Sequence, residues 1–270
     1  MRIKILGTAA AEGWPALFCS CETCRKARQL GGKNIRSRAA IQFGEKHRID
    51  FGPDAWYHEA ILNVDISKLE HLFITHSHED HFYHQQLHYL IPPFGHGRTG
   101  ALHVYGNEKV ISTLKEHWGR LEGETIILHK IEPFVPIQAG NMIFTPLRAI
   151  HMQGGEIPLN YIASDGSKTI LYNCDTGQYE DDTWDYLEST KIDCVISECT
   201  CGPLPGGGGH MNFKTVLSLK ERLEKFGSYT TGPFIVTHFS HNIGMMHDEI
   251  EELLKPHGII VAYDGMEVVI

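Results

Sequence analysis

Three histidines and one aspartate lie within six residues, in the segment His76-Ser77-His78-Glu79-Asp80-His81. This segment follows the apolar, β-branched run at 72–75, which predicts a buried strand with the polar residues on the loop at its end. Imidazole and carboxylate groups together form a binding set for Zn²⁺, Mn²⁺ or Fe²⁺. His76 and His78 can face one ion, while Asp80 and His81 turn toward a second. The alternative is a histidine-rich surface turn, which the particular order of ligand types disfavours.

Further residues of the same chemical kind stand directly after later predicted strands, namely His151, Asp175 and His238. His151 falls where the first ion lacks a third ligand. Asp175 has two carboxylate oxygens and is able to bridge two ions, although a turn aspartate is the competing interpretation. His210 follows the glycine run at 205–209. A histidine on such a loop suits acid catalysis gated by substrate, unless the loop is merely disordered.

A second candidate metal site begins at Cys19, Cys21 and Cys24. Three thiols this close, in a chain expected to be reduced, predict three thiolates around one structural zinc. A closed zinc site needs a fourth ligand, and a distant histidine or cysteine must supply it because the cluster offers none. Unligated or redox-active thiols are the alternative interpretation.

The chain has 270 residues, of which 42% are hydrophobic and 21% are charged, as in ordinary globular proteins. Its formal net charge of −9 argues against a broad electrostatic contact with nucleic acid. A small phosphate ester is compatible with this charge, because bound divalent ions supply a positive field of their own. Residues 1–6 predict a strand rather than a signal peptide, and no apolar run approaches the roughly 20 residues of a membrane helix. We therefore expect a cytoplasmic protein without a membrane partner and without disulfides.

Several other polar residues allow more than one interpretation. Asp50, at the end of a predicted strand, either orients a metal-ligating histidine or belongs to a turn. His84 and His88 lie one helical turn apart, either as extra ligands or, as we favour, in a helix that covers the rim of the site. Seven of the 18 histidines are expected to be ordinary surface residues: His47, His58, His96, His117, His129, His247 and His257.

The hydrophobic pattern predicts strands and helices that alternate through both halves of the chain. The predicted strands are 1–6, 41–43, 48–52, 72–75, 102–105, 125–128, 141–145, 168–172, 194–198 and 234–237, and the predicted helices are 54–63, 110–118 and 213–226. Residues 258–270 predict a closing hairpin around Asp264-Gly265. The small-residue loop at 7–13 fits neither the dinucleotide fingerprint nor a phosphate loop. No proline- or serine-rich linker divides the chain, so we expect one α/β domain over residues 1–270.

The His-x-His-x-Asp-His segment resembles the signature of the metallo-β-lactamase-fold hydrolases. Within that superfamily the chain is most similar to the PhnP-type phosphoribosyl cyclic phosphodiesterases of phosphonate metabolism. The similarity spans nearly the whole chain and includes the Gly7-Thr8 to Gly13 opening, Cys19, Cys21 and Cys24, the 76–81 segment, Asp175-Thr176, His210, Thr237-His238, Ser240-His241 and the Asp264-Gly265-Met266-Glu267 ending. The resemblance implies a four-layered αββα sandwich, an α/β (α+β) fold with two mixed sheets flanked by helices, which periodicity alone does not predict.

The resemblance also implies roles for the candidate residues. It divides seven ligands between two ions: His76, His78 and His151 for the first, Asp80, His81 and His238 for the second, and Asp175 as the bridge. His241 would complete a Cys₃His set as the fourth ligand of the structural zinc. Asp80 and His210 would be catalytic, with His210 as the general acid. The implied cofactors are two divalent ions, Mn or Zn, in the active site and one structural Zn.

The implied activity is hydrolysis of a small cyclic phosphate ester, such as 5-phosphoribosyl 1,2-cyclic phosphate. Two cations roughly 3.5–4 Å apart lower the pKa of a bridging water, and the resulting hydroxide attacks phosphorus in line. His210 then gives a proton to the leaving sugar oxygen. We also expect the structural zinc to hold His238 in place, because His238 and His241 are three residues apart.

Three departures from the family pattern lie near the pocket and leave the substrate open: His84 where a glycine is common, a longer loop after His151, and the glycine run before His210. RNA 3′-processing nucleases share the motif, but the acidic charge and the lack of a basic arm disfavour them. Lactone and thioester hydrolases do not account for the Cys₃His set, and cofactor-biosynthesis relatives with similar cysteines tend to lack the full ligand set. A non-catalytic metal-binding or sensing module is the alternative from another class. The sequence does not decide which metal the protein binds in the cell or whether the chain forms a homodimer.

Overall fold

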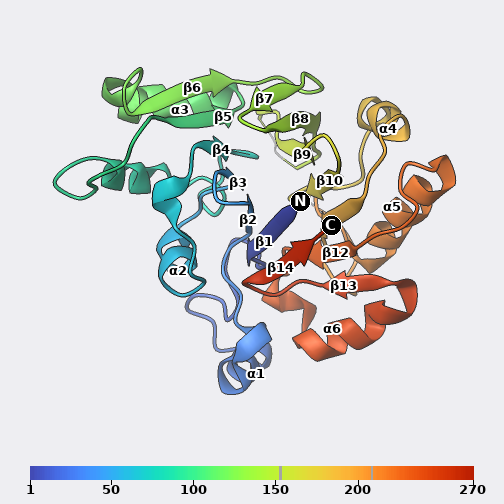
Figure 1. Ribbon diagram of the computed structural model, residues 1–270. Coiled ribbons are helices and arrows are strands. Elements are labelled where there is room, and N and C mark those ends of the chain that lie inside the picture. Colours follow the sequence, from blue (N-terminus) through green and yellow to red (C-terminus); the bar gives the residue numbers. More distant parts are fainter. Residues whose placement is uncertain (152–153, 208) are drawn as a thin grey trace.

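The computed structural model describes residues 1–151, 154–207 and 209–270. Two seven-stranded sheets make up the centre of the molecule (Figure 1). The first sheet has the order β14-β1-β2-β3-β4-β5-β6, with β1 (Arg2–Gly7), β2 (Ala40–Phe43), β3 (His47–Ile49), β4 (His71–Phe73), β5 (Leu102–Gly106), β6 (Ile126–Lys130) and β14 (Met266–Val269). The second has the order β13-β12-β11-β10-β9-β8-β7, with β7 (Ile137–Ala139), β8 (Met142–Arg148), β9 (Leu159–Ser164), β10 (Thr169–Asn173), β11 (Cys194–Glu198), β12 (Phe234–Thr237) and β13 (Ile259–Val261).

Helices cover the outer faces of both sheets. The α-helices are α1 (Glu22–Leu30), α2 (Ala55–Ala60), α3 (Glu108–Trp118), α4 (Asp181–Glu188), α5 (Phe213–Phe226) and α6 (His247–Leu254), and the 3₁₀-helices are η1 (Gly32–Asn34), η2 (Ile66–Lys68), η3 (His84–Leu90), η4 (Gly119–Leu121), η5 (His241–Ile243) and η6 (Lys255–His257). The apolar sides of α4, α5 and α6 pack in one buried cluster on the second sheet, and α2, α3 and η3 pack in another on the first. The four layers confirm the predicted αββα sandwich.

The core cluster between the two sheets is mainly aliphatic and contains a group of packed aromatic rings. Phe73 of β4 stacks on Phe144 of β8 with the ring centroids 4.0 Å apart, and Tyr161 of β9 meets Phe73 edge to face at 5.6 Å. All three side chains are buried. Their burial from both sheets fixes one sheet against the other, so the loops at the sheet ends have a rigid base.

Within each sheet, the strands that precede the candidate ligands run in the same direction. In the first sheet β3, β4, β5 and β6 are parallel, and in the second β10, β11, β12 and β13 are parallel. β8 and β10 are each antiparallel to β9 and therefore run in the same direction as each other. Because the carboxyl ends of such strands meet at one edge, their following loops converge there.

The predicted hairpin at 258–270 is wrong. β13 pairs in parallel with β12 in the second sheet, whereas β14 pairs antiparallel with β1 in the first. The turn at Asp264-Gly265 carries the chain from one sheet to the other, because the Asp264 carboxylate faces inward and accepts hydrogen bonds from Thr8 and Ser37.

Three histidines expected on the surface are buried: His47 at 3%, His58 at 1% and His247 at 1% relative exposure. Of the other four in that group, His129 is half-buried, and His96, His117 and His257 are exposed. A buried imidazole needs a polar partner, and each of the three has one within the fold.

The segment with His84 and His88 forms the 3₁₀-helix η3 rather than a turn of α-helix. Trp118 Nε1 donates a hydrogen bond to His84 Nδ1 at 3.1 Å, and the His88 ring also meets Trp118. Both histidines therefore pack against the end of α3.

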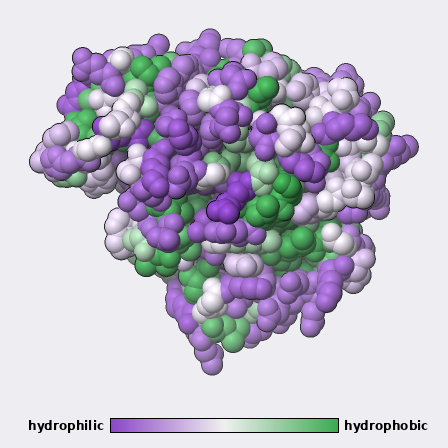
Figure 2. Space-filling model, in the orientation of Figure 1, coloured by the Kyte–Doolittle hydropathy of each residue, from purple (hydrophilic) through white to green (hydrophobic). Residues whose placement is uncertain are grey.

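Hydrophilic residues cover much of the face shown in Figure 2, with apolar residues gathered near its centre and lower half. Among residues 1–151, 154–207 and 209–270, no helix combines the length and the apolar character that a membrane crossing requires.

Candidate functional site

The seven predicted ligands of the active site lie together at the carboxyl edge of the strands. They form two groups of four whose ligand atoms lie within 4.8 Å of one another, and both groups contain Asp175: His76, His78, His151 and Asp175 in one, and Asp80, His81, His238 and Asp175 in the other. The site residues are thus brought into the arrangement that the resemblance implies. Their role as ligands stays a prediction.

The first group converges on a small volume. His78 Nδ1 lies 2.9 Å from His76 Nε2 and 3.2 Å from His151 Nε2. Asp175 Oδ2 lies 3.4 Å from His76 Nε2 and 3.6 Å from His151 Nε2. Two ligands each about 2.0–2.1 Å from a tetrahedral zinc ion would be about 3.3 Å apart, so these separations suit one ion.

The second group has similar dimensions. His81 Nε2 lies 3.1 Å from Asp80 Oδ2 and 2.9 Å from Asp175 Oδ2. His238 Nε2 lies 3.1 Å from the other oxygen of Asp175, Oδ1. Each oxygen of Asp175 therefore contacts the second group, while Oδ2 also contacts the first, as a bridging carboxylate requires.

The far side of the His81 ring is fixed by Asp50. His81 Nδ1 donates to Asp50 Oδ2 at 2.7 Å, and the main-chain N–H of Thr75 donates to Asp50 Oδ1 at 2.8 Å. With the proton on Nδ1, His81 Nε2 keeps its lone pair for an ion. Of the two interpretations of Asp50 from sequence, this contact favours the one in which it orients a ligand.

Two threonines fix the tautomers of His76 and His238 in the same way. The hydroxyl of Thr75 donates to Asp50 at 3.0 Å, so the hydroxyl oxygen accepts from His76 Nδ1 at 3.0 Å. The hydroxyl of Thr200 donates to Glu198 at 2.6 Å and accepts from His238 Nδ1 at 2.8 Å. Both rings therefore present an unprotonated Nε2 to the centre of the site.

The buried polar atoms at the centre fit a cation. His81 Nε2, His238 Nε2 and Asp175 Oδ1 are buried and make no hydrogen bond, which is costly without a further partner. Burial alone would lower the pKa of His81, but the charges of Asp80, Asp50 and Asp175 raise it well above its usual value. Since these carboxylates are themselves buried, the site attracts positive charge.

Three of the site residues adopt the left-handed backbone conformation although they are not glycine: Asp50 at φ 67°, Asp175 at φ 51° and His238 at φ 57°. Such conformations are uncommon for these residues and persist where the surrounding structure enforces them. Each one turns the chain sharply at the end of its strand, so that the side chain points into the site.

Gly52 lets two ligand-bearing loops pack closely. A Cβ at this position would lie 2.0 Å from the carbonyl oxygen of Asp80, and the N–H of the neighbouring Phe51 donates to the carbonyl of His81 at 2.7 Å. The Asp-x-Gly pattern at 50–52 therefore places both the Asp50 carboxylate and the backbone against the Asp80-His81 pair.

His210 lies beside the ligands and is held by Glu198. His210 Nδ1 donates to Glu198 Oε1 at 3.0 Å and lies 3.4 Å from Asp175 Oδ1. Burial alone would lower the pKa of His210, but the hydrogen bond and charge of Glu198 and the charge of Asp175 raise it to about 9. Of the 205–209 run that precedes it, Gly208 is outside the described residues, as are residues 152–153 in the loop after His151.

Sequence reasoning gave no role to Glu198 or Glu156. Glu198 is fully buried at the end of β11 and accepts hydrogen bonds from Thr176, Thr200, His210 and Met211. The sequence signal for Glu198 was a carboxylate at the end of a mostly apolar strand. Glu156 accepts from the N–H and hydroxyl of Ser77 at 2.9 and 2.5 Å, and nothing in the local sequence indicates that contact.

The three clustered cysteines meet His241. His241 Nδ1 lies 4.0, 3.6 and 3.4 Å from the sulfurs of Cys19, Cys21 and Cys24. A tetrahedral zinc with its usual bond lengths would place sulfur and nitrogen about 3.6 Å apart, so the group fits the ion. Cys21 caps α1, and its hydrogen bond from the Cys24 N–H is the main reason that the pKa of the Cys21 thiol is lowered to about 6.

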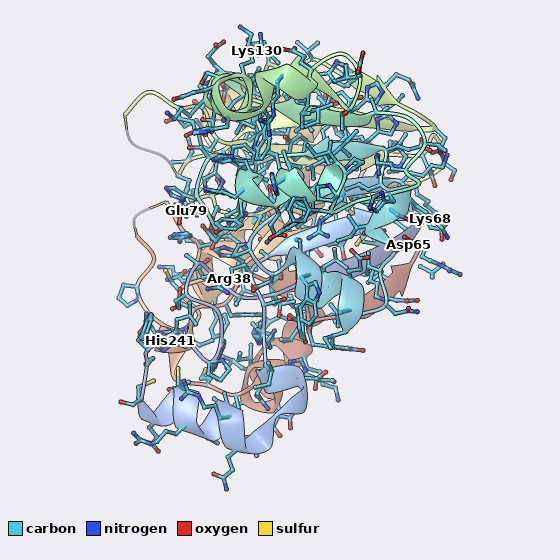
Figure 3. All side chains as sticks on the ribbon, turned by 90° about the vertical axis from the view of Figure 1, so that its left-hand side faces the viewer. Arg38, Asp65, Lys68, Glu79, Lys130 and His241 are labelled. Atoms are coloured by element: carbon cyan, nitrogen blue, oxygen red, sulfur yellow. The ribbon has the colours of Figure 1, made fainter. Side chains whose placement is uncertain are left out.

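In Figure 3 the labelled Glu79, from the 76–81 loop, and His241 both lie toward the left-hand edge. Asp65 and Lys68, which precede β4, lie at the opposite edge. Both candidate metal sites therefore occupy one side of the molecule.

Comparisons with known proteins agree with this arrangement. The family model described as "Beta-lactamase superfamily domain" matches residues 49–239. The structure is similar to that of "a New Diphosphatase from the PhnP Family", with 22% identity, a TM-score of 0.78 and coverage of 99% of this chain and 97% of the other. It is also similar to Zn²⁺-bound PqqB from Methylobacterium extorquens, with 14% identity, a TM-score of 0.77 and full coverage of both chains.

One curated relative matches over a short stretch. Coenzyme PQQ synthesis protein B of Bradyrhizobium diazoefficiens is 40% identical over 43 residues, which are 16% of this chain and 14% of that protein. The family match covers most of the chain and includes the end of β3, the 76–81 segment, Asp175 and His238. The chain belongs to the β-lactamase superfamily and has the metallo-β-lactamase fold.

Proposed function

We propose that the protein is a metal-dependent hydrolase that cleaves a small cyclic phosphate ester, such as 5-phosphoribosyl 1,2-cyclic phosphate. The observation that carries this proposal is the pair of four-residue groups that share Asp175, with His210 beside them. When bound, two divalent ions lower the pKa of a water between them and stabilise charge on phosphoryl oxygens. Divalent manganese and zinc both suit the mixed nitrogen and oxygen ligands.

Side chains of the protein would position the two groups, deliver a proton and hold the histidine rings. Asp175 would hold the two groups in register through its two oxygens. Glu198 holds His210 Nδ1, so Nε2 is the nitrogen available to deliver a proton to the leaving sugar oxygen. Asp50, Thr75 and Thr200 would keep the three histidine rings in one tautomer throughout the reaction.

A diphosphate ester is the second candidate substrate, since the similar PhnP-family structure is described as that of a diphosphatase. Both substrates would present charged phosphoryl oxygens to the same groups. They differ in the leaving group, which is a sugar hydroxyl in the cyclic ester and a phosphate in the diphosphate. The leaving phosphate needs no proton at neutral pH. The contribution of His210 to the rate should therefore be large for the cyclic ester and small for the diphosphate.

The test compares hydrolysis of ribose 1,2-cyclic phosphate 5-phosphate with that of 2′,3′-cyclic nucleotides, a nucleoside diphosphate ester, a lactone and a precursor tRNA. The metal content of the protein is quantified, and Mn²⁺ or Zn²⁺ is added. We expect the highest kcat/KM for a phosphate ester, and loss of that activity in Asp80→Ala but not in Asp185→Ala, which changes an exposed aspartate.

A preference for the lactone or the RNA would contradict the proposal. A metal-sensing module would instead bind ions tightly and turn over none of these substrates.

A further inference from the structure

Arg48 lies directly behind the candidate site and is fully buried. Its Nε donates to the main-chain carbonyl of Asp50 at 2.8 Å, and its Nη2 faces His58 Nδ1 at 2.8 Å. The guanidinium also lies over the ring of Phe51, 5.0 Å from its centroid. The side chain therefore binds the carbonyl of Asp50 and packs on the ring of Phe51, the two residues that begin the 50–52 loop.

The chemistry of arginine fixes the protons of the neighbouring groups. Arginine only donates, so His58 Nδ1 must accept, and the proton of the neutral ring lies on Nε2. His58 Nε2 then donates to the Ser37 hydroxyl at 2.9 Å, and that hydroxyl donates to Asp264 Oδ2 at 2.6 Å. Burial, and the charge of Arg48, lower the pKa of His58 well below its usual value, in keeping with a neutral ring.

The far end of this chain of hydrogen bonds is the turn that joins the two sheets. Asp264 also accepts from the N–H of Ser37 at 2.6 Å and from the hydroxyl of Thr8 at 2.7 Å. Thr8 belongs to the 7–13 loop and Asp264 to the 264–267 segment. Neither segment has a role in the proposed reaction. The connection runs from them to Arg48 and Asp50.

At the other end of this chain of hydrogen bonds lies the backbone of Asp50, which has an uncommon conformation. Asp50 has φ 67°, and its carboxylate holds both His81 Nδ1 and the N–H of Thr75. A side chain bound to the Asp50 carbonyl restricts the rotation that would release this conformation. The Asp50 carboxylate orients His81. A loss of that restraint would therefore change the geometry of the group of Asp80, His81, His238 and Asp175.

We propose that Arg48, held in place by His58, is a positioning residue for the second metal-binding group, because it fixes the Asp50 backbone whose carboxylate orients His81. This inference rests on the two-ion site of the proposed function. In the part of the chain that the structure describes, Arg48 forms no hydrogen bond with a candidate ligand, and its proposed effect passes through Asp50. Asp50 reaches the first group only through a further hydrogen bond, because the Thr75 hydroxyl that donates to Asp50 also accepts from His76 Nδ1, so we expect a smaller effect on that group.

Arg36 supplies a matched control. It is also buried, its Nη1 donates to the Ala262 carbonyl at 2.6 Å, and its Nη2 faces His247 Nδ1 at 3.0 Å. It thus makes the same kinds of contact as Arg48. Its further contacts are a hydrogen bond to the Thr8 hydroxyl at 2.8 Å and the ring of Phe239, 4.8 Å from the centroid. In the described residues it forms no hydrogen bond with Asp50 or with a candidate ligand.

The experiment is a metal titration of the metal-depleted full-length chain against a chromogenic chelator, with Mn²⁺ and with Zn²⁺. His78→Ala, which removes a ligand of the first group only, assigns the two binding steps. We expect Arg48→Lys to weaken the second site about tenfold, the lower end of the range for residues that support a ligand, and to change the first site by less than about threefold. Arg36→Lys should lower the melting temperature and leave both affinities unchanged.

Unchanged affinity at the second site of Arg48→Lys would overturn the inference, as would equal losses at both sites or an equal loss in Arg36→Lys. If Arg48→Lys fails to fold, His58→Ala takes its place, because it frees the guanidinium and should shift the same constant. Nitrogen-15 NMR of the histidine rings gives an independent readout: the proton of His58 must lie on Nε2, and a proton on Nδ1 would contradict the network. A wild-type chain that binds no ions at these groups would instead refute the proposed function.

Discussion

His210 is held by a buried carboxylate at Nδ1, as His81 is, but it lies outside the two groups of four predicted ligands. Glu198 accepts from its Nδ1, and its ring lies 4.7 Å from that of His151 and 5.9 Å from that of His238, measured between centroids. The imidazole is thus fixed beside the ligands with one nitrogen already used. This placement suits a group that transfers a proton.

The first prediction concerns His210→Ala. For a phosphate ester with a sugar leaving group we expect kcat to fall by about 10²–10⁴-fold, the usual contribution of general acid catalysis. For bis-p-nitrophenyl phosphate the loss should be much smaller, because p-nitrophenolate leaves without a proton. Steady-state kinetics on both esters, at equal metal content, measure the difference.

His257→Ala is the control for this variant, because His257 is exposed and ends η6, the 3₁₀-helix that follows α6. It should retain wild-type activity on both esters. Equal losses on the two esters in His210→Ala would show that His210 does not protonate the leaving group.

At the scale of elements, the amino-terminal segment that includes the cysteine cluster is joined to the end of β12 in two ways. The N–H of Phe239 donates to the Thr8 carbonyl at 2.9 Å, and the N–H of Ala10 donates to the Phe239 carbonyl at 3.1 Å. His241 meets the three cysteines two residues later. A metal at this group would therefore restrain the segment that carries His238.

The second prediction follows from this connection. Cys21→Ser should release the Cys₃His metal and also weaken binding of the second active-site ion, because His238 loses part of its support. Metal analysis after gel filtration, with the first site assigned as above, measures both losses. Ser20→Ala, in the same loop, should change neither, and full occupancy of the second active-site position in Cys21→Ser would refute the connection.

The third prediction concerns the contact between the 50–52 and 80–81 loops. Gly52→Ala would place a Cβ 2.0 Å from the Asp80 carbonyl oxygen, so one loop must move. We expect the free energy of unfolding to fall by about 1–3 kcal/mol, as for other overpacked sites. Denaturant unfolding of the metal-depleted chain measures this cost.

Gly119→Ala is the matched control, because Gly119 has φ −52° and no atom within 4 Å of its added Cβ. Its unfolding free energy should stay close to that of the wild type. A Gly52→Ala chain as stable as this control would show that the two loops do not need their close contact.

The fourth prediction concerns the amino ends of β3 and β4, far from the site. The rings of His47 and His71 stack there with centroids 4.9 Å apart, and burial is the main reason that the pKa of His71 is lowered to about 4. The unfolded histidine titrates near 6.5, so the stability that neutral His71 contributes is fully present above pH 6.5 and lost as the pH falls toward 4.

We therefore expect the free energy of unfolding to decrease between pH 7 and pH 5, and to decrease less in His71→Gln than in the wild type. Urea unfolding at pH 7, 6 and 5 checks this, with the exposed His257→Gln as the control that keeps the wild-type slope. Equal slopes in all three chains would contradict the assigned origin of the pH dependence.

Local patterns indicated which residues meet at the candidate site, because these residues follow apolar strands, and the helix at 213–226 was predicted with the bounds of α5. The sequence did not reveal β9, which is buried almost throughout and therefore lacks alternation. The closing hairpin was wrong because Asp264-Gly265 is a turn signal in either setting, and only the distant Thr8 and Ser37 decide which sheet the next strand joins. The burial of His58 was missed for the same reason, since its partners Arg48 and Ser37 come from other elements.

At the scale of the whole molecule, the fold brings loops from both sheets to one edge. Asp50 and the 76–81 segment come from the first sheet, and Asp175, Glu198 and His238 come from the second. The core between the sheets fixes their separation, and the two groups of candidate ligands share Asp175. A two-ion site in this position therefore depends on the packing of the entire sandwich.

The most direct test of this account is a crystal structure of the metal-loaded chain, with diffraction measured at the manganese and zinc absorption edges. The account predicts two anomalous peaks roughly 3.5–4 Å apart, one on each side of Asp175 and each within bonding distance of its own group of ligands. A single peak, or none, around Asp175 in a fully loaded protein would contradict it.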